Sequence, residues 1–325
     1  MQAEIRTERF DQLQDRWLSI LEFCSTNTIF VTPWWQRIWW KHFGEKSDLQ
    51  LLSVYHMGDL IGIAPLRFRE GKISFVGSQD LCDYGDFPVI KGKELIFFES
   101  LMNYLNTLQW EVVELNSVPQ ESQTLNYLPL IAKKLGYDVS VLKEDTTPFV
   151  DLPHLWEDYL IGLPKKYRHE LRRKIRRLEG AGAFRQYSER RLENIRDSMG
   201  DFFRLHRSSS LEKSQFMTSE NESFFMEVAS DFATRGQFNL SFLEFENVSV
   251  ASCIAFDYGD DYLLYNSGYD PKYSNLSVGL LNKAFTVKEA ISTGRQRFDF
   301  LRGSERYKYE LGAVDRSIFQ IIVHR

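Results

Sequence analysis

The sequence predicts an α/β protein of two related lobes, each a mixed, mainly antiparallel sheet flanked by helices, with a charged helical segment between them. Three observations predict this. The length of 325 residues fits two domains of roughly 150 residues each. Hydrophobic residues (43%) and charged residues (26%) occur at ordinary globular levels. Residues 49–118 and 240–303 also share one order of elements, namely a hairpin, a third strand, a polar loop, a helix and a strand. We infer an internal duplication and expect lobes at 1–147 and 148–325, separated by the turn-prone stretch at 145–148.

The first lobe follows from hydrophobic spacing and turn residues. Residues 1–45 are expected to be helical, with Thr32 as an N-cap and Pro33 at the first helical position. Apolar and β-branched runs around Met57-Gly58-Asp59 predict a β-hairpin. The predicted elements are strands at 49–56, 60–68 and 72–77, a short strand near 87–90, a helix at 93–108, a strand at 110–118 and a helix near 120–135.

The second lobe repeats these signals. Residues 154–238 are expected to be mostly helical, and a second hairpin turns at Asn247. The predicted elements are strands at 240–246, 248–258 and 262–269, a helix at 280–294, and strands at 297–303 and 317–323.

Bulk properties exclude several classes of protein. The net charge of −5 is opposite in sign to that of general nucleic-acid binders, so any polyanion must meet a local basic patch. The three cysteines are far apart and form no C-x-x-C pair, which argues against a disulfide framework or a thiolate zinc site and fits a reducing compartment. The charged N-terminus resembles no signal peptide, and no apolar run approaches ~20 residues. We therefore expect a cytoplasmic protein with no transmembrane segment.

The junction DPKYSNLSVGLL at 270–281 is the first candidate site. Helix N-termini carry free N–H groups and a partial positive charge, which suits a pyrophosphate. Ser277 can cap the predicted helix, and Gly279 would let a ligand approach the backbone closely. The alternative is an ordinary capped helix start, because the full G-x-G-x-x-G and P-loop patterns are missing.

The segment DFLRGSERYK at 299–308 places charged groups where a strand runs into a glycine turn. Asp299 or Glu305 can accept a proton from a nucleophile, and Arg302 or Lys308 can hold a phosphate or carboxylate. The alternative is an Asp–Arg pair that only ties the turn.

The loop DLCDYGDF at 80–87 concentrates acidic residues around one tyrosine. Asp83, Tyr84 and Asp86 can bind an amine or cationic substrate. The alternative is a turn held by side-chain bonds to its own backbone. No nearby residues complete a recognisable metal-ligand set, so no metal is expected.

The stretch PKKYRHELRRKIRRLEG at 164–180 predicts a basic helix. Eight cationic side chains with one intervening acid surround an apolar face. Lys165, Arg168 and Arg172 are candidates for contact with a polyanion such as coenzyme A, tRNA or an anionic membrane surface. The alternative is a solvated helix face.

These segments together resemble a known family. The chain is similar to GNAT-like acetyltransferases associated with cellulose or exopolysaccharide biosynthesis, and through them to Fem-type aminoacyl transferases. The similarity lies in the segments TPWWQRIWWKHFG, LIGIAPLRF, DYGDF, LPKKYRHELRRKIRRLE, YNSGYDPKYSNLSVGLL and FDFLRGSERYK. The resemblance implies two GNAT-like lobes and an acyl-CoA pyrophosphate loop at Ser277, Val278, Gly279 and Leu280, although this loop has one glycine instead of two. It also implies an acceptor cleft between the lobes, near Asp83, Tyr84, Asp86, Tyr269, Asp299, Arg302, Glu305 and Lys308.

The function expected from residues and resemblance is acyl transfer from acyl-CoA, with acetyl-CoA as the expected donor, to an amine or hydroxyl of a small molecule, sugar or peptide. Asp299 or Glu305 would deprotonate the acceptor, and Tyr269 or Tyr307 would protonate the leaving thiolate. Two alternatives stay open. One is aminoacyl transfer from a charged tRNA bound by the basic helix, and the other is a non-catalytic module that binds an anionic ligand.

Overall fold

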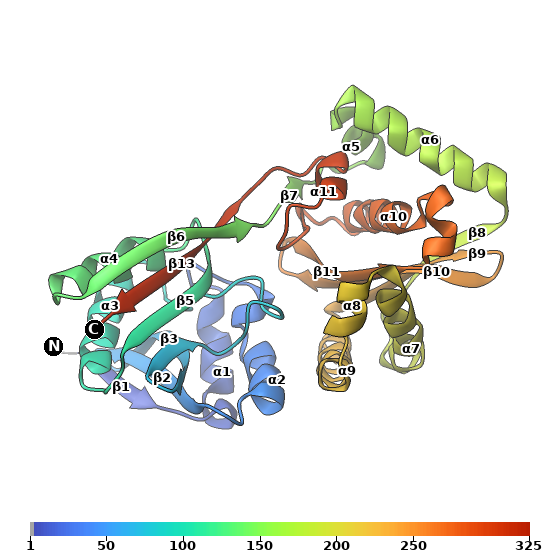
Figure 1. Cartoon of the computed structure of the whole chain (residues 1–325). Helices are drawn as coiled ribbons and strands as arrows, with labels where there is room; N and C mark the ends of the chain where they lie inside the picture. Colours follow the sequence, from blue (N-terminus) through green and yellow to red (C-terminus); the bar gives the residue numbers. More distant parts are fainter. Residues whose placement is uncertain (1–2) are drawn as a thin grey trace. The chain divides into compact units, whose positions relative to one another are not determined.

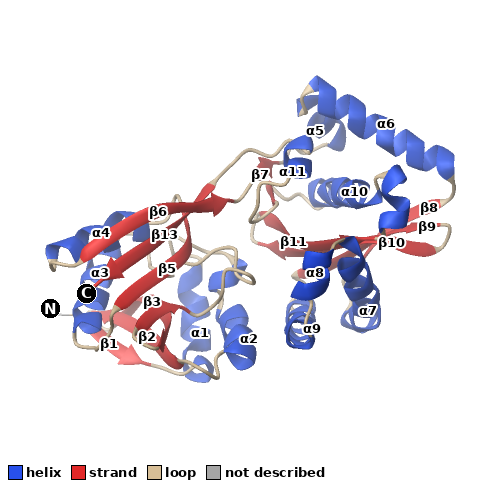
Figure 2. Cartoon of the chain, viewed as in Figure 1, coloured by secondary structure: helices blue, strands red, loops and turns tan. Residues whose placement is uncertain are grey.

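The strands form two separate mixed sheets, one in each of two units into which the chain divides (Figures 1 and 2). The computed structural model describes residues 3–325. The first unit contains the chain up to Thr146 together with Arg316–Arg325, and the second contains Thr147–Asp315.

The first unit has a seven-stranded sheet in the order β1-β2-β3-β4-β5-β13-β6. Its elements are β1 (Glu4–Thr7), α1 (Phe10–Leu21), η1 (Ile29–Val31), α2 (Pro33–Phe43), β2 (Asp48–His56), β3 (Asp59–Arg69), β4 (Lys72–Phe75), α3 (Glu94–Asn106), β5 (Val112–Pro119), α4 (Thr124–Lys134), β6 (Asp138–Thr146) and β13 (Ser317–His324).

The second unit has a six-stranded sheet in the order β7-β12-β11-β10-β9-β8. Its elements are β7 (Phe149–Asp151), α5 (Trp156–Gly162), α6 (Lys165–Ala181), β8 (Phe184–Glu189), α7 (Leu192–Ser209), α8 (Leu211–Phe216), α9 (Ser219–Thr234), β9 (Phe238–Phe245), β10 (Val248–Tyr258), β11 (Asp261–Tyr269), η2 (Pro271–Leu276), α10 (Val278–Ser292), β12 (Arg297–Asp299) and α11 (Arg306–Glu310).

The two sheets repeat one topology, as the order of elements in the sequence predicts. In each, an antiparallel hairpin and third strand precede a helix and a strand that pairs in parallel with the third, as β4 with β5 and β11 with β12. An antiparallel strand then flanks the parallel pair, β13 beside β5 and β7 beside β12. The fold class predicted from the sequence is confirmed.

The C-terminal boundary of the second lobe is corrected by the structure. Residues 316–325, expected in the lobe at 148–325, belong to the first unit. The reason is that β13 lies between β5 and β6 and pairs with both, which puts Ile318, Ile321 and Val323 into the first unit's core.

Local predictions fail where long-range pairing decides the conformation. The strand β1 lies within the stretch at 1–45 that was expected to be helical, and β8 lies within the helical stretch at 154–238. Each pairs at the side of a hairpin strand, β1 with β2 and β8 with β9. The strand expected near 87–90 consists only of isolated bridges at Val89 and Ile90. The Thr32 cap is confirmed, since its side chain accepts from the N–H of Trp35.

In the second unit, helices cover both faces of the sheet (Figure 1). Helix α10 lies on one face, and α7, α8 and α9 lie on the other. Leu281, Ala284, Val287 and Ile291 on α10 recur every three or four residues and are buried against the sheet. Helices therefore pack on β11 and β12 from both faces of the sheet, and this packing fixes the strand ends at which a site can form.

Candidate functional site

The strands β11 and β12 separate inside the second unit's sheet. They pair in parallel only from Asp261 to Leu263, because β12 ends at Asp299 while β11 continues to Tyr269. The register of β11 against β10 shifts beside Tyr265, which is a β-bulge. Bulges are common next to active sites, and a strand edge without a neighbour can pair with the amide groups of a ligand. We call the opening between β11 and β12 the split.

Helix α10 begins beside the end of β11 and directs backbone donors outward. Its first helical bond runs from the N–H of Leu281 to the carbonyl of Ser277 at 3.0 Å, so the N–H groups of Val278, Gly279 and Leu280 have no acceptor within the helix. Its first turn contains no acid. This N-terminus therefore keeps its partial positive charge and suits an anion.

Two expectations about this junction are wrong in detail. Ser277 occupies the N-cap position, but its backbone is left-handed (φ 58°) and its side chain makes no capping bond. Gly279 does not face open space, because a Cβ built there would lie 3.1 Å from Cδ1 of Tyr269. The glycine is needed so that the ring of Tyr269 can pack on α10, and not to admit a ligand.

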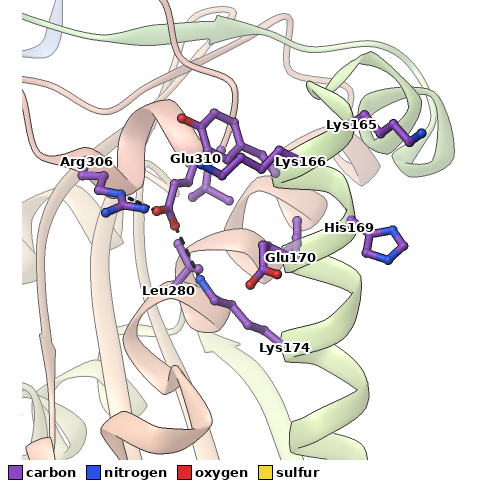
Figure 3. A pocket seen from close by; sticks show the side chains of 11 residues that line it. Lys165, Lys166, His169, Glu170, Lys174, Leu280, Arg306 and Glu310 are labelled. Carbon is purple, nitrogen blue, oxygen red and sulfur yellow. Dashed lines mark hydrogen bonds and ion pairs between the residues drawn. The ribbon is translucent and has the colours of Figure 1, made fainter.

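A cavity of about 720 Å³ opens between α6, α10 and α11. Leu280 from the first turn of α10 lines it (Figure 3). In Figure 3, Lys174 and Arg306 both point toward the carboxylate of Glu310, with ion-pair distances of 3.5 and 2.8 Å. Its charged lining residues are the cations Lys165, Lys166, Lys174 and Arg306 and the acids Glu170 and Glu310, with His169 beside them. Positive charge therefore predominates.

The basic helix predicted at 164–180 is α6, and it lies beside this cavity. Lys165 lines the cavity, Arg168 donates to the carbonyl of Ile161 at 2.7 Å, and Arg172 pairs with Glu157 at 3.3 Å. Arg177 donates to the carbonyl of Asn275 in η2 at 2.8 Å. That bond fixes α6 beside the loop that leads into α10.

The turn after β12 is held by two buried charged side chains. Asp299 is 1% exposed, and its Oδ1 accepts from the N–H of Leu301, whose backbone is left-handed (φ 57°). Lys308 is also 1% exposed, and its Nζ donates to the carbonyls of Leu301, Arg302 and Gly303 at 3.0, 2.6 and 2.9 Å. Both side chains are engaged with the turn itself.

Glu305 and Tyr307 lie close together after this turn. The side chain of Glu305 is 58% exposed and pairs with Lys308 at 2.9 Å. The ammonium of Lys283 lies 4.7 Å from the ring centroid of Tyr307. Burial, and then the charge of Glu305, raise the pKa of Tyr307 well above its usual value, so its phenol keeps its proton.

Two lysines of this region were missed by the sequence analysis. Lys283 is 7% exposed on α10, and Lys213 on α8 donates to the carbonyl of Ser267 in β11. Burial and the charge of Lys283 lower the pKa of Lys213 to about 8, and burial also lowers that of Lys283. The only local signal is that Lys283 interrupts the apolar face formed by Leu281, Ala284 and Val287.

The acidic loop at 80–87 lies in the first unit, whereas the other candidate residues lie in the second. Tyr84 is buried, accepts a hydrogen bond from Arg316 and lines a cavity of about 240 Å³. Asp86 is buried and accepts from the hydroxyls of Thr26 and Thr124. Burial raises the pKa of Asp86, although these hydroxyls oppose the shift. Asp83 is half-buried beside them.

Within residues 3–325, no three His, Cys, Asp or Glu side chains gather as a metal site would require. Over the same range no helix has the length and hydropathy needed to cross a bilayer.

Comparison with known protein families gives a match within the second unit. Residues 165–309 match the family model described as an acetyltransferase (GNAT) domain. The second unit is a GNAT domain. No curated protein matches the chain by sequence. The split, the α10 N-terminus and the turn after β12 all lie within this GNAT domain.

Solved structures extend the likeness to the whole chain. FemX matches with a TM-score of 0.66 at 11% identity and covers 98% of this chain and 96% of its own. A tandem GNAT protein from the clavulanic acid biosynthesis pathway matches with a TM-score of 0.54 at 10% identity over 98% of each chain. L-PGS from Bacillus licheniformis matches with a TM-score of 0.54 at 13% identity over 94% and 90%. The chain thus has a tandem GNAT-like fold, which these solved structures share.

Proposed function

We propose that this protein transfers an acyl group from acyl-CoA, with acetyl-CoA as the expected donor, to an amine or hydroxyl. The observation that carries the proposal is the N-terminus of α10. Three backbone donors with no helical acceptor and no acid in the first turn lie beside a cavity whose charged lining residues are more often cations than acids. The pyrophosphate of coenzyme A carries the charge and the acceptor oxygens that such a site binds.

The part of the donor beyond its pyrophosphate would enter the GNAT domain through the split. The pantetheine arm contains amides that can pair with the open edge of β11 beyond Leu263. A donor held at α10 and along this edge would bring its thioester to the turn after β12. Holding both substrates there would supply much of the rate acceleration, because positioning alone lowers the barrier by roughly 7–11 kcal/mol in favourable cases.

We assign the proton transfers to Glu305 and Tyr307. Glu305 is exposed enough to reach an acceptor, whereas Asp299 is buried and holds the turn. Tyr307 keeps its proton at neutral pH and can donate a hydrogen bond to the leaving thiolate as the C–S bond breaks. In this proposal Lys308 and Asp299 position the turn that carries Arg302, and Tyr269 shapes the start of α10 by packing on Gly279.

A role of Tyr84 in binding the acceptor stays a prediction, and Tyr84 lines a cavity within the first unit. That cavity also presents Arg67, Asn116 and Ser117, which are hydrogen-bonding groups suited to a sugar or peptide. Asp86 is assigned to holding the loop, because its oxygens already accept from hydroxyl groups. The link to cellulose or exopolysaccharide biosynthesis and the cytoplasmic location stay predictions.

Calorimetric titration with acetyl-CoA and desulfo-CoA tests the donor, with Leu280→Glu as the decisive variant. Glutamate in a first helical turn favours the helix but places a carboxylate beside the proposed pyrophosphate. At ~6 Å and an effective dielectric constant of 20–40, the repulsion is about 1.5–3 kcal/mol, or at least roughly tenfold in Kd. Leu280→Gln has the same shape without the charge and should bind like the wild type. Equal binding by both variants would remove α10 from the donor site.

Aminoacyl transfer from a charged tRNA is the second candidate, favoured by the exposed cations of α6. Lys165, Lys166, Arg176 and their neighbours give a helix face that can contact several phosphates. FemX and L-PGS share the fold. Steep salt dependence of tRNA binding that flattens in Arg176→Gln, with no turnover of acetyl-CoA, would favour this donor. Anion binding without turnover of either donor would favour the non-catalytic alternative.

A further inference from the structure

Two lysines reach the split from opposite faces of the sheet. Lys213 lies on α8, which covers one face together with α7 and α9, whereas Lys283 lies on α10 on the other face (Figure 1). Lys213 donates to the carbonyl of Ser267, in the part of β11 that extends past the end of β12. The charge of Lys283 acts on Lys213 and, together with burial, lowers the pKa of Lys213.

The structure gives these ammonium groups too few acceptors. An ammonium has three N–H donors. Lys283 is 7% exposed, and its hydrogen bond is to the carbonyl of Gly279 one turn earlier, at 3.2 Å. Lys213 has the carbonyl of Ser267. Lys308, by contrast, reaches three carbonyls and pairs with Glu305. Counting partners among residues 3–325, Lys213 and Lys283 thus have donors left over for a further partner.

The charges around the two lysines do not balance. Glu305 is the acid that acts on both, and it already pairs with Lys308. Burial raises the pKa of Cys253, so its thiol stays neutral and adds no negative charge. His206 on α7 faces Lys213, and burial lowers its pKa to about 4, so it adds no charge near neutral pH. One buried and one half-buried cation with little compensation are costly unless an anion joins them.

We propose that Lys213 and Lys283 stabilise the negative charge that develops on the carbonyl oxygen of the transferred acyl group. This inference rests on the proposed acyl transfer. The acceptor's nitrogen or oxygen bonds to the carbonyl carbon, and the C=O π pair moves onto oxygen. The oxyanion then collapses, the C–S bond breaks, and the acceptor's proton ends on the thiolate. An ester donor would form the same oxyanion, so the inference holds for aminoacyl-tRNA as well.

Thiol release from acetyl-CoA, with water as acceptor, tests the inference in four variants. Lys213→Met and Lys283→Met should lower kcat by roughly 10²–10³ and leave KM nearly unchanged, as loss of an oxyanion donor does. Lys213→Arg keeps the cation and should retain most of the activity. Lys288→Met removes an exposed lysine from the same helix and should match the wild type.

The pH profile distinguishes a cationic role of Lys213 from a structural role or a role as general base. Activity that depends on protonated Lys213 should fall as pH rises above about 8, and this fall should move to higher pH in Lys213→Arg. Activity that instead rises through pH 8, or a Lys213→Met enzyme with kcat within threefold of the wild type, would overturn the proposal.

A second measurement does not need turnover. Lysines labelled with ¹³C at Cε are titrated by NMR, and the Lys213 signal is assigned with Lys213→Arg. Lys283→Met should raise the pKa of Lys213, because a like charge is removed. If the wild type releases no thiol, the acyl-CoA proposal fails, and this titration alone decides whether the lysines share one site. An unchanged pKa of Lys213 would refute the shared site.

Discussion

Replacing Lys308 with methionine tests whether this lysine builds the site or binds a ligand. Methionine keeps most of the side-chain volume and removes three charge-assisted hydrogen bonds, to the carbonyls of Leu301, Arg302 and Gly303. Such bonds contribute roughly 1.5–3 kcal/mol each, and the cost of desolvating a 1%-exposed ammonium offsets part of their sum. We expect Lys308→Met to lower the free energy of unfolding by about 3–5 kcal/mol.

Urea unfolding followed by circular dichroism measures this loss, and a thermal scan should show a decrease of roughly 10 °C in Tm. Lys288→Met is the matched control, because an exposed lysine on α10 should change stability by less than about 0.5 kcal/mol. A loss below 1 kcal/mol for Lys308→Met would mean that the turn does not depend on Lys308. The ammonium would then be available for a cofactor, and the structural assignment would be refuted.

Four further predictions follow from the same contacts. Burial lowers the pKa of His206 to about 4 from its usual 6.5, so the native state binds fewer protons in this range. Its contribution of about 3 kcal/mol should be complete above pH 6.5 and lost as pH falls toward 4, a slope that His206→Asn should flatten in urea titrations. Gly279→Ala should destabilise the GNAT domain by about 1–3 kcal/mol, because the new Cβ meets Tyr269 at 3.1 Å, and a fully stable variant would contradict the packing. Glu305→Gln should lower kcat by at least 10² while Lys308 keeps its three carbonyl acceptors, and equal turnover would exclude it as the base. Deletion of 316–325 should abolish folding of the first unit while the GNAT domain retains its own unfolding transition, as limited proteolysis can report.

The elements that the sequence predicts correctly are those fixed by local chemistry. Met57 and Gly58 adopt positive φ in the first hairpin turn, and Glu246 and Asn247 do so in the second. Gly58 and Asn247 are residue types that favour such turns, so the turns are visible in a short window. The position of β13 depends instead on partners about two hundred residues away, and no local pattern encodes that pairing.

The candidate site also contains some residues that the sequence identifies and others that it does not. The junction at Leu280 and the turn at Asp299 were found because glycine, serine and charged residues mark the ends of elements. Lys213 and Lys283 were missed because their importance comes from burial and from each other, and they are far apart in the sequence. The role of Asp299 could not be chosen from sequence either, since exposure decides between a base and a turn-holding residue.

The two units share a sheet topology but differ at the start of one helix, and this difference is why the donor site is assigned to the GNAT domain and not to the first unit. Strands β4 and β5 also separate after a short parallel pairing, and a cavity of about 240 Å³ lies there. However, α3 begins only at Glu94, well after β4 ends at Phe75, and Glu94 places a carboxylate in the first turn, where it accepts from Ser25 at 2.9 Å. That carboxylate already compensates the partial positive charge of the helix. Helix α10 has no acid in its first turn. The two units therefore have the same sheet topology but differ in whether the start of the helix can receive a phosphate.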